Sequence, residues 1–474
     1  MADPATIMIR RQILDVELHG AESDGLALQH RLSAISTDVL SPALEAAFGG
    51  IDADGVYLSV DRLEIDLGNL RLDRLEPELV EALGREVADH FRHAAMVPAG
   101  AETPAGASNG TVLQRSVAET LDDALVVFLR TGRLPWFYRP PPGSSIESLV
   151  LEAWDSRDTG PPSLTTTRLR SALADPTART RLFAQFSPRF VTALLDHLAP
   201  ELAIDTEQVV RAVHTPEVSA TARTAFTRLV WDLAFSAAST RRTVDARELV
   251  AGAWPAGGLS ERDERALADA IEVRWPGAIT RLERSGPVAE QPVSDRSGAE
   301  RIPAALDEGD DGLVIDNAGL VLLHPFLVSF LEGLGVASEG ELIDPNRALC
   351  LLHHLATGER TAPEHQLTLA KVLCGIPLDV PAESDVGLTD DHAAEATALL
   401  DAAIGHWEAL RNTSVDTLRA EFLVRPGSLA VDAFDDWVLR VEPRGVDILL
   451  DQLPWGTSAV KLPWMRHLMK VEWR

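Results

Sequence analysis

Histidine can change its charge near neutral pH and is the commonest metal ligand, so the histidine groups come first. His353 and His354 are adjacent and His365 lies close behind them, while His90 and His93 are three residues apart. Neighbouring residues on a helix point about 100° apart, so His353 and His354 do not face one metal. The acidic residues near His90 and His93 form no ligand pattern. We therefore predict no metal site.

Cysteines and glycine-rich loops add no chemistry. The chain has two cysteines, Cys350 and Cys374, which make neither a disulfide framework nor a zinc site, and which we expect to be reduced and buried. The sequence contains no phosphate-binding Gly-x-x-x-x-Gly-Lys-Ser/Thr loop, no Gly-x-Gly-x-x-Gly between a strand and a helix, and no His-Glu-x-x-His. We therefore predict no catalytic residues and no cofactor, which favours a non-enzymatic protein.

One charged group suggests binding rather than catalysis. Apolar residues alternate with polar ones over residues 14–18 and 63–67, which predicts two strands that share an apolar face. If the strands pair, their opposite face gathers four carboxylates: Asp15, Glu17, Glu64 and Asp66. Like charges across a strand pair destabilise each other. Such a face is screened by water and nearby arginines, or covered by a basic protein partner, or covered by a divalent cation.

Three tryptophans form a second candidate interaction group. The chain has ten tryptophans and two tyrosines, and Trp136, Trp455 and Trp464 each follow a Leu-Pro pair. Proline holds the preceding leucine extended, so each indole is displayed from a stiff turn. Tryptophan dominates many interface hot spots. These indoles therefore either pack at corners between the chain's own domains or fill a partner's pocket.

The overall charge restricts the partners. The chain has 72 acidic and 43 basic residues, a net charge of −29, which argues against nucleic acid and anionic membranes as partners. The charge favours solubility or docking on a basic surface. The most apolar window, residues 319–336, contains His324, Pro325 and Glu332, so we expect a buried helix rather than a membrane segment. The first residues show no secretory signal pattern, which predicts a cytoplasmic protein.

The hydrophobic periodicity predicts a mainly α protein with small α+β elements at both ends. Helices are expected over 24–48, 75–92 and 390–410, the last capped by Thr389. Strands are expected over 56–60, 437–441 and 469–473. The expected parts are an N-terminal α+β domain (1–97), a linker (98–110), a helical variable middle without strands (111–284), a disordered acidic linker (285–312) and a C-terminal helical domain ending in short strands (313–474).

Seven segments, in order, resemble a known family. They read "IRRQILDVELHGAESDGLALQHRLS", "YLSVDRLEIDLGNL", "ALVVFLRTGRLPWF", "NAGLVLLHPFLVSFLEGLG", "PEHQLTLAKVLCGIPL", "HWEALRNTSVDTLRAEFL" and "VDILLDQLPWGTSAVKLPWM". Together they are similar to the tape measure proteins of contractile injection systems, which are phage-tail-like bacterial particles. The resemblance thins between residues 144 and 310, so it covers two family-like ends around a variable middle.

The resemblance implies a structural role without catalytic residues. It implies that the protein lies in or along the inner tube during assembly, sets the tube length, and is bound at one end to the baseplate hub. Inner-tube and hub proteins are then the partners, with several copies per particle as one possibility. The alternatives are an assembly chaperone, a cap or baseplate adaptor, or a cargo protein. With 29 prolines the chain is not one straight helix, so the middle rearranges in the tube or copies stack.

Overall fold

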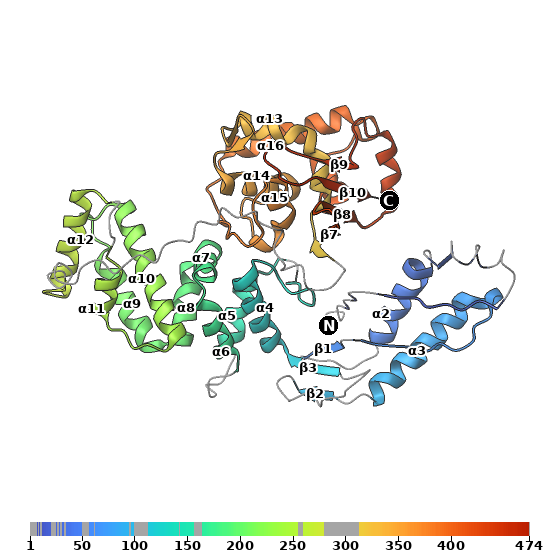
Figure 1. Ribbon diagram of the computed structural model, residues 1–474, viewed down its shortest axis with the longest axis horizontal. Helices are drawn as coiled ribbons and strands as arrows, with labels where there is room; N and C mark the ends of the chain where they lie inside the picture. Colours follow the sequence, from blue (N-terminus) through green and yellow to red (C-terminus); the bar gives the residue numbers. More distant parts are fainter. Residues whose placement is uncertain are drawn as a thin grey trace. The chain divides into compact units, whose positions relative to one another are not determined.

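The computed structural model divides the chain into two compact units, residues 1–123 and 124–474 (Figure 1). It describes residues 7, 9, 12–19, 25, 28, 31–32, 35–49, 56–60, 62–93, 96–98, 112–141, 143–155, 164–254, 259–278 and 312–473. The predicted linker over 98–110 lies outside these residues except for its first position, and the predicted acidic linker over 285–312 lies outside them except for Gly312.

The first unit combines a small sheet with a helix pair. Its elements are a π-helical turn (Ser36–Leu40), α2 (Ser41–Gly49), β1 (Val56–Val60), a 3-10 turn (Leu72–Arg74), α3 (Leu75–His93), β2 (Met96–Pro98) and β3 (Val112–Ser116). The strand order is β1-β3-β2. β3 runs antiparallel to β1, with Val56 opposite Ser116, and parallel to β2. The two strands that flank the predicted linker are therefore neighbours.

The helix pair encloses the core of this unit. Leu40 and Leu44 are buried together with Leu79, Leu83 and Val87 of α3, which recur at the spacing of one helix face. Phe48 meets Phe91 edge to face, with ring centroids 5.6 Å apart. The predicted helices over 24–48 and 75–92 are thus confirmed where the structure describes them.

Two strand predictions for this unit are wrong. Residues 12–19 and 62–70 belong to no strand, and Leu14 and Val16, expected to face the core, are 38% and 48% exposed. Ile65 and Leu67 do pack against the helix core. The predicted strand over 56–60 is confirmed as β1, and it pairs with β3, which lies in a region predicted to contain no strand. Local alternation thus predicted one strand correctly and two wrongly, and it did not specify a pairing partner.

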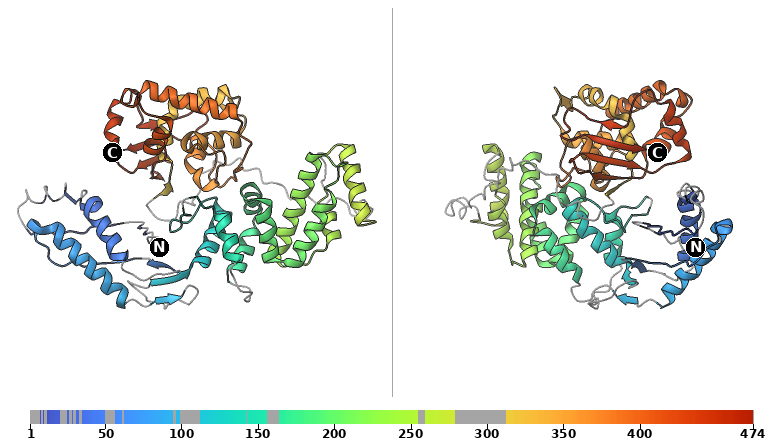
Figure 2. Two further views of the ribbon diagram at one scale, coloured as in Figure 1. Left: turned by 180° about the vertical axis from the view of Figure 1, so that it is seen from behind. Right: turned by 45° about the vertical axis from the view of Figure 1, so that its right-hand side comes forward.

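The helical middle of the second unit is an array of short helices (Figure 2). They are α4 (Val117–Thr131, which crosses the unit boundary), α5 (Ile146–Asp155), α6 (Leu164–Leu173), α7 (Pro176–Gln185), α8 (Pro188–Leu198), α9 (Pro200–Ala212), α10 (Ala220–Thr240), α11 (Ala246–Gly252) and α12 (Glu261–Arg274). Prolines begin α7, α8 and α9, where a missing backbone N–H costs nothing. The chain's high proline content is thus compatible with helices, provided that they are short.

Helix α10 is the centre of the array. It contacts α6, α7, α8, α9, α11 and α12. Its buried residues include Ala222, Phe226, Val230 and Ala234, four residues apart, so one face is apolar along its length. Ser219 accepts a hydrogen bond from the Ala222 amide and caps the start of the helix.

The C-terminal block of the second unit is a five-stranded sheet with helices packed on one side (Figures 1 and 2). The sheet order is β4-β7-β8-β10-β9, and β5 (Ala337–Ser338) and β6 (Glu341–Leu342) form a separate hairpin. The sheet strands are β4 (Leu313–Ile315), β7 (Gly427–Val431), β8 (Trp437–Val441), β9 (Ala459–Val460) and β10 (Met469–Trp473). β8 and β10 are the two strands predicted from alternation, and they pair in parallel with Trp437 opposite Met469.

The helical part of the block covers a large apolar core. The helices are α13 (His324–Gly333), α14 (Pro345–Thr357), α15 (Thr368–Leu373), α16 (Asp390–His406) and α17 (Val415–Leu418); a π-helical turn (Arg419–Leu423) and 3-10 turns (Ala318–Leu323, Glu364–Gln366, Glu408–Leu410, Gly445–Gln452) join them. Thr389 caps α16 as predicted, accepting from the His392 amide.

The apolar window over 319–336 is buried as a 3-10 turn followed by α13. Among the described residues, no helix is long and apolar enough to cross a membrane.

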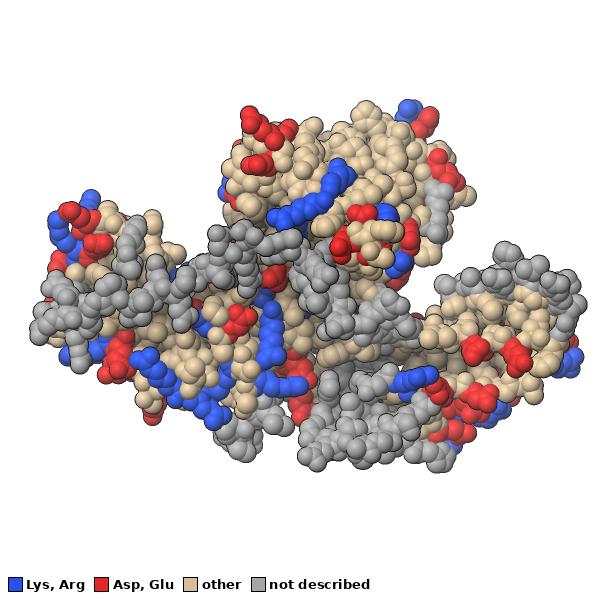
Figure 3. Space-filling view, viewed as in Figure 1, with Lys and Arg blue, Asp and Glu red and all other residues tan. Residues whose placement is uncertain are grey.

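The negative charge is concentrated at the two ends of the sequence. Residues 1–123 contain 22 acidic and 9 basic residues, and residues 313–474 contain 24 acidic and 12 basic residues. Residues 124–278 contain 18 of each, and all 18 basic residues are arginines. On the face shown in Figure 3, basic side chains accordingly lie among acidic ones over the helical middle.

The packing of Gly319 gives a first test of this fold. A Cβ atom at Gly319 would overlap the carbonyl oxygen of Phe422, whereas a Cβ at Gly333 of α13 would meet open space. We therefore expect Gly319→Ala to lower the free energy of unfolding by about 3 kcal/mol or more. Gly333→Ala is the matched control, and it should be neutral or raise stability by up to ~1 kcal/mol. Urea unfolding of the two variants measures the difference, and equal midpoints would contradict the packing described.

Candidate functional site

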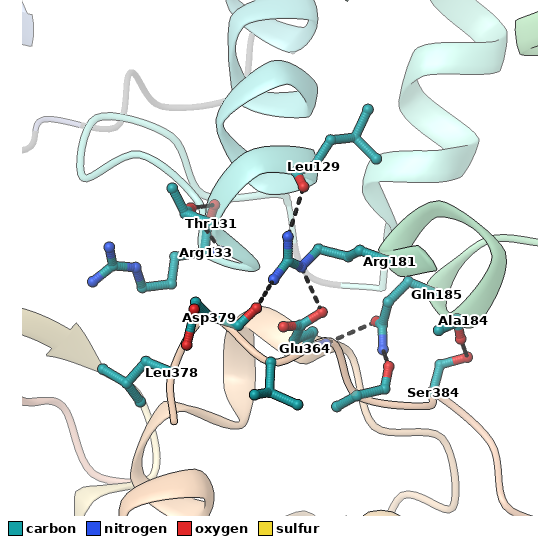
Figure 4. A network of polar contacts seen from close by, with 12 residues as sticks. Leu129, Thr131, Arg133, Arg181, Ala184, Gln185, Glu364, Leu378, Asp379 and Ser384 are labelled. Atoms are coloured by element: carbon teal, nitrogen blue, oxygen red, sulfur yellow. Dashed lines mark hydrogen bonds and ion pairs between the residues drawn. The ribbon is translucent and has the colours of Figure 1, made fainter. Parts of the chain in front are cut away.

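A buried ion cluster joins the helical middle to the C-terminal block (Figure 4). Arg181 of α7 and Glu364, which begins a 3-10 turn of the C-terminal block, are both fully buried. The Arg181 Nε lies 2.9 Å from Glu364 Oε2. The other guanidinium nitrogens donate to the carbonyl oxygens of Leu129 at 2.6 Å and Asp379 at 2.7 Å. The guanidinium thus binds three separate parts of the chain.

Lys371 of α15 completes the cluster on the other side of Glu364. Its Nζ lies 2.6 Å from Glu364 Oε1 and donates to the carbonyl oxygens of Leu378 at 3.1 Å and Val380 at 2.7 Å. Burial lowers the pKa of Lys371, and the Glu364 carboxylate opposes that effect. Each oxygen of Glu364 therefore receives one cation, and each donor of the ammonium has a partner.

Neutral hydrogen bonds extend the contact along the end of α7. Gln185 donates to the carbonyl oxygen of Ala382 at 2.7 Å and accepts from the Glu364 amide at 2.8 Å. Both the amide and the hydroxyl of Ser384 donate to the carbonyl oxygen of Ala184, each at 3.0 Å. We call Arg181, Gln185, Glu364, Lys371 and Ser384 the junction.

Gly132 leaves room for the junction. It ends α4 with a φ of +73°, and a Cβ there would overlap the carboxylate of Glu364. Glycine is therefore required twice at this position, by the left-handed backbone and by the close approach of a side chain.

The junction holds parts together rather than doing chemistry. Its charged groups are paired and out of contact with water, so it offers no open position for a substrate or a metal. Among the described residues, no group of three His, Cys, Asp or Glu side chains is placed to bind a metal ion. The arrangement fixes the orientation of α7 against the C-terminal block.

A second buried pair fixes the end of the chain. Arg425 binds Asp447 through two nitrogen–oxygen contacts of 2.7 and 3.0 Å and donates to the carbonyl oxygen of Glu442 at 2.6 Å. Its guanidinium lies 5.4 Å from the ring centre of Trp473 in the last strand. Burial would raise the pKa of Asp447, but hydrogen bonds from Arg425 and the Arg444 amide outweigh it, so the pKa is lowered.

The predicted acidic face does not form as a strand pair. Asp15 and Glu17 lie on an exposed stretch outside any strand. Glu64 forms an exposed ion pair with Arg62, and Asp66 accepts a hydrogen bond from the Gly68 amide at 2.9 Å. Glu64 and Asp66 therefore have local partners, and their proposed binding role stays a prediction.

Two of the three tryptophans contact the C-terminal core. The Trp455 Nε1 donates to the carbonyl oxygen of Leu322 at 2.9 Å, and its ring meets Phe326 edge to face at 5.2 Å. The Trp464 Nε1 donates to the carbonyl oxygen of Leu373 at 2.7 Å. Trp136 is half-buried beside Phe137. The contacts of Trp455 and Trp464 are those expected of packing residues; a docking role for any of the three stays a prediction.

The chain matches a known protein family over almost its whole length. The chain matches the family model described as contractile injection system tape measure protein over residues 6–473. It belongs to that family. Comparisons with curated proteins and with solved structures give no match. The match includes the helical middle, where the resemblance of individual segments was weakest.

The segments that carried the resemblance meet one another in space. "FLRTGRLPWF" supplies Leu129 and Gly132, and "PEHQLTLAKVLCGIPL" supplies Glu364 and Lys371, to the same junction. A Cβ at Gly375 would overlap the carbonyl oxygen of Trp464. The segment that contains Trp464 therefore packs on the segment that contains Gly375. These family-like segments are thus contact surfaces of one folded unit.

The sequence interpretation missed the junction residues. Arg181 lies in the region assigned as a variable middle, and nothing distinguishes it locally from other helical arginines. The sequence did indicate that Lys371 is unusual, because the chain has only three lysines and this one interrupts the apolar run "LTLAKVLCGI". A charged residue in such a run is rarely buried without a partner.

Removal of Arg181 tests the junction directly. Arg181→Met leaves the carbonyl oxygens of Leu129 and Asp379 without a donor and Glu364 with one cation. We expect the free energy of unfolding of the second unit to fall by about 3–5 kcal/mol. The control is Arg189→Met on the next helix, because Arg189 is exposed. Thermal or urea unfolding checks the prediction, and equal stability of the two variants would contradict it.

The buried His353 and the half-buried His365 predict acid sensitivity. Burial lowers the pKa of His353 to about 4, with the nearby His365 and His354 adding to the effect, and burial lowers the pKa of His365 to about 4. The folded state therefore favours the neutral rings. Their contribution to stability is complete above about pH 6.5 and is lost as pH falls toward 4.

Each of these histidines should contribute a slope of up to about 1.4 kcal/mol per pH unit between pH 6.5 and 4. His353→Leu removes one titrating group, so its unfolding free energy should fall less steeply on acidification than that of the unchanged protein. His214→Leu, at an exposed position, is the control. The pH dependence of urea unfolding measures the slopes, and a steeper or unchanged slope in His353→Leu would refute the assignment.

Proposed function

We propose that the protein is a non-enzymatic assembly component that acts as a tape measure and governs inner-tube length in a contractile injection particle. The observation that carries this proposal is the family match over residues 6–473. The junction supports it, since the most buried charged groups are used to hold the fold together and none is left open for reaction.

The geometry favours copies that stack over one chain that extends. The longest described helix, α10, has 21 residues, which is about 32 Å. Pulling the helical middle out into a line would separate Arg181 from Glu364 and leave the buried carboxylate with Lys371 as its remaining cation, at a cost of several kcal/mol. We therefore favour folded copies lying one after another along the tube lumen during assembly.

The charge distribution supports docking by the two ends. Residues 1–123 and 313–474 are strongly acidic, whereas residues 124–278 are neutral. Complementary charge steers association and selects partners. We propose basic surfaces of the inner tube and of the baseplate hub as the partners of the acidic ends.

An assembly chaperone, or a cap or baseplate adaptor, is the second candidate. It is favoured by one observation, namely that the described helices are short and packed into compact units. Such a protein would act on the particle without defining its length. A cargo role has no comparable support in the described residues.

Lengthening the chain separates the two candidates. An insertion of 30 helical residues into the segment over 285–312 adds about 45 Å to each copy. If the protein is a tape measure, electron microscopy of purified particles should show tubes longer by about 45 Å, or by a multiple of it that reports the number of stacked copies. The matched control replaces 285–312 with a Gly/Ser segment of the same length, and it should leave the tube length unchanged.

One result would exclude the tape-measure role: particles with the lengthened protein that assemble normally and have tubes of unchanged length. The amount of the protein retained in purified extended particles then distinguishes an adaptor, which stays, from a chaperone, which leaves.

A further inference from the structure

The loop between β7 and β8 displays a large apolar side chain. Residues 432–436 connect the two strands, and Phe434 at the tip is 82% exposed. Loop tips usually carry small or polar residues. Phe434 is the one aromatic side chain among the exposed large hydrophobic residues of the described part of the chain.

The loop is held rigidly. Asp432 Oδ1 accepts from the amides of Phe434 at 2.8 Å and Asp436 at 3.1 Å, and the Asp435 amide donates to the Asp432 carbonyl oxygen at 3.1 Å. Lys470 of β10 binds Asp432 Oδ2 at 2.5 Å, and its ammonium lies 5.6 Å from the Phe434 ring centre. The Phe434 side chain thus extends from a backbone whose conformation is already fixed.

The residue type at Asp435 suits the backbone of this loop. Asp435 has a φ of +62°, a left-handed conformation that aspartate and asparagine adopt more readily than other L-residues. The turn is therefore formed by a residue that tolerates it, and Phe434 precedes that residue at the tip.

The charge around Phe434 indicates the kind of partner. Asp432, Asp435 and Asp436 surround the tip, and Lys470 is the cation that binds two of them, Asp432 and Asp436. Three carboxylates against one ammonium leave the rim of the tip negative. A complementary surface has an apolar pocket with arginine or lysine at its edge.

We propose that the Phe434 tip is a docking point for a protein partner with an apolar pocket rimmed by basic residues. The proposal rests on the proposed function, because that partner is an inner-tube or baseplate-hub protein of the particle. A second copy of this chain is a poorer fit, because the chain has a net charge of −29. One hollow on the helical middle, of about 410 Å³, is lined by Glu147, Glu152 and Asp155, with Arg189 as the cation among the lining residues.

Binding of the purified protein to purified tube and hub proteins tests the proposal. Phe434→Ser should weaken binding by about 30-fold, the loss typical of an aromatic hot spot. The control is Val273→Ser, since Val273 of α12 is 86% exposed but lies on a regular helix; its affinity should not change. Because Phe434 is exposed, the variant should keep the thermal midpoint of the unchanged protein.

A second variant tests the charge independently of the ring. Asp435→Asn tolerates the left-handed conformation and removes one negative charge. Its binding should be about 2- to 5-fold weaker at low salt, and the difference should disappear at high salt.

The outcomes separate this inference from the proposed function. If the unchanged protein binds a tube or hub protein and Phe434→Ser binds it equally well, the tip is not the docking point and the proposed function stands. If the unchanged protein binds none of them, the proposed partners are wrong and this inference fails with them. Loss of self-association alone in Phe434→Ser, seen by ultracentrifugation, would make a second copy the partner and overturn the proposal.

Discussion

The second unit depends on one carboxylate that is shared by two cations from different parts of the chain. Glu364 binds Arg181 of the helical middle and Lys371 of the C-terminal block, and all three side chains are buried. Burying ions costs desolvation energy, so such a cluster adds little net stability compared with apolar packing. The cluster disfavours alternative arrangements, because an orientation of α7 that separates Arg181 from Glu364 takes one of two cations away from a buried carboxylate. We interpret the junction as the set of contacts that fixes the orientation of the helical middle against the C-terminal block.

This constraint connects the fold to the family. The family-like segments are dispersed in the sequence, and the structure brings those of the second unit together around the junction and the C-terminal core. Leu-Pro-Trp turns contribute two indoles to that core, each hydrogen-bonded to a backbone carbonyl. The helical middle takes part in this constraint, since Arg181 belongs to it.

The sequence predicts the local elements well and the long-range contacts poorly. The helices α3 and α16 and the strands β1, β8 and β10 follow from periodicity and capping, which are local properties of the chain. The pairing of β1 with β3 does not follow from the sequence, because the alternation within one strand does not determine which other strand it pairs with. Arg181 escaped notice for the same reason: its burial is created by residues far away in the sequence. The predicted acidic face over Asp15, Glu17, Glu64 and Asp66 failed as a strand pair because neither 12–19 nor 62–70 forms a strand.

The most direct test of the central claim is native-state hydrogen exchange at the junction. The amides of Glu364 and Ser384 donate to Gln185 and Ala184 across the junction, at 2.8 and 3.0 Å. If the junction holds the helical middle to the C-terminal block, these two amides should be protected as strongly as the strand amides of β8. Exchange as rapid as that of exposed loop amides, with β8 still protected, would show that the two parts separate freely and would contradict the account.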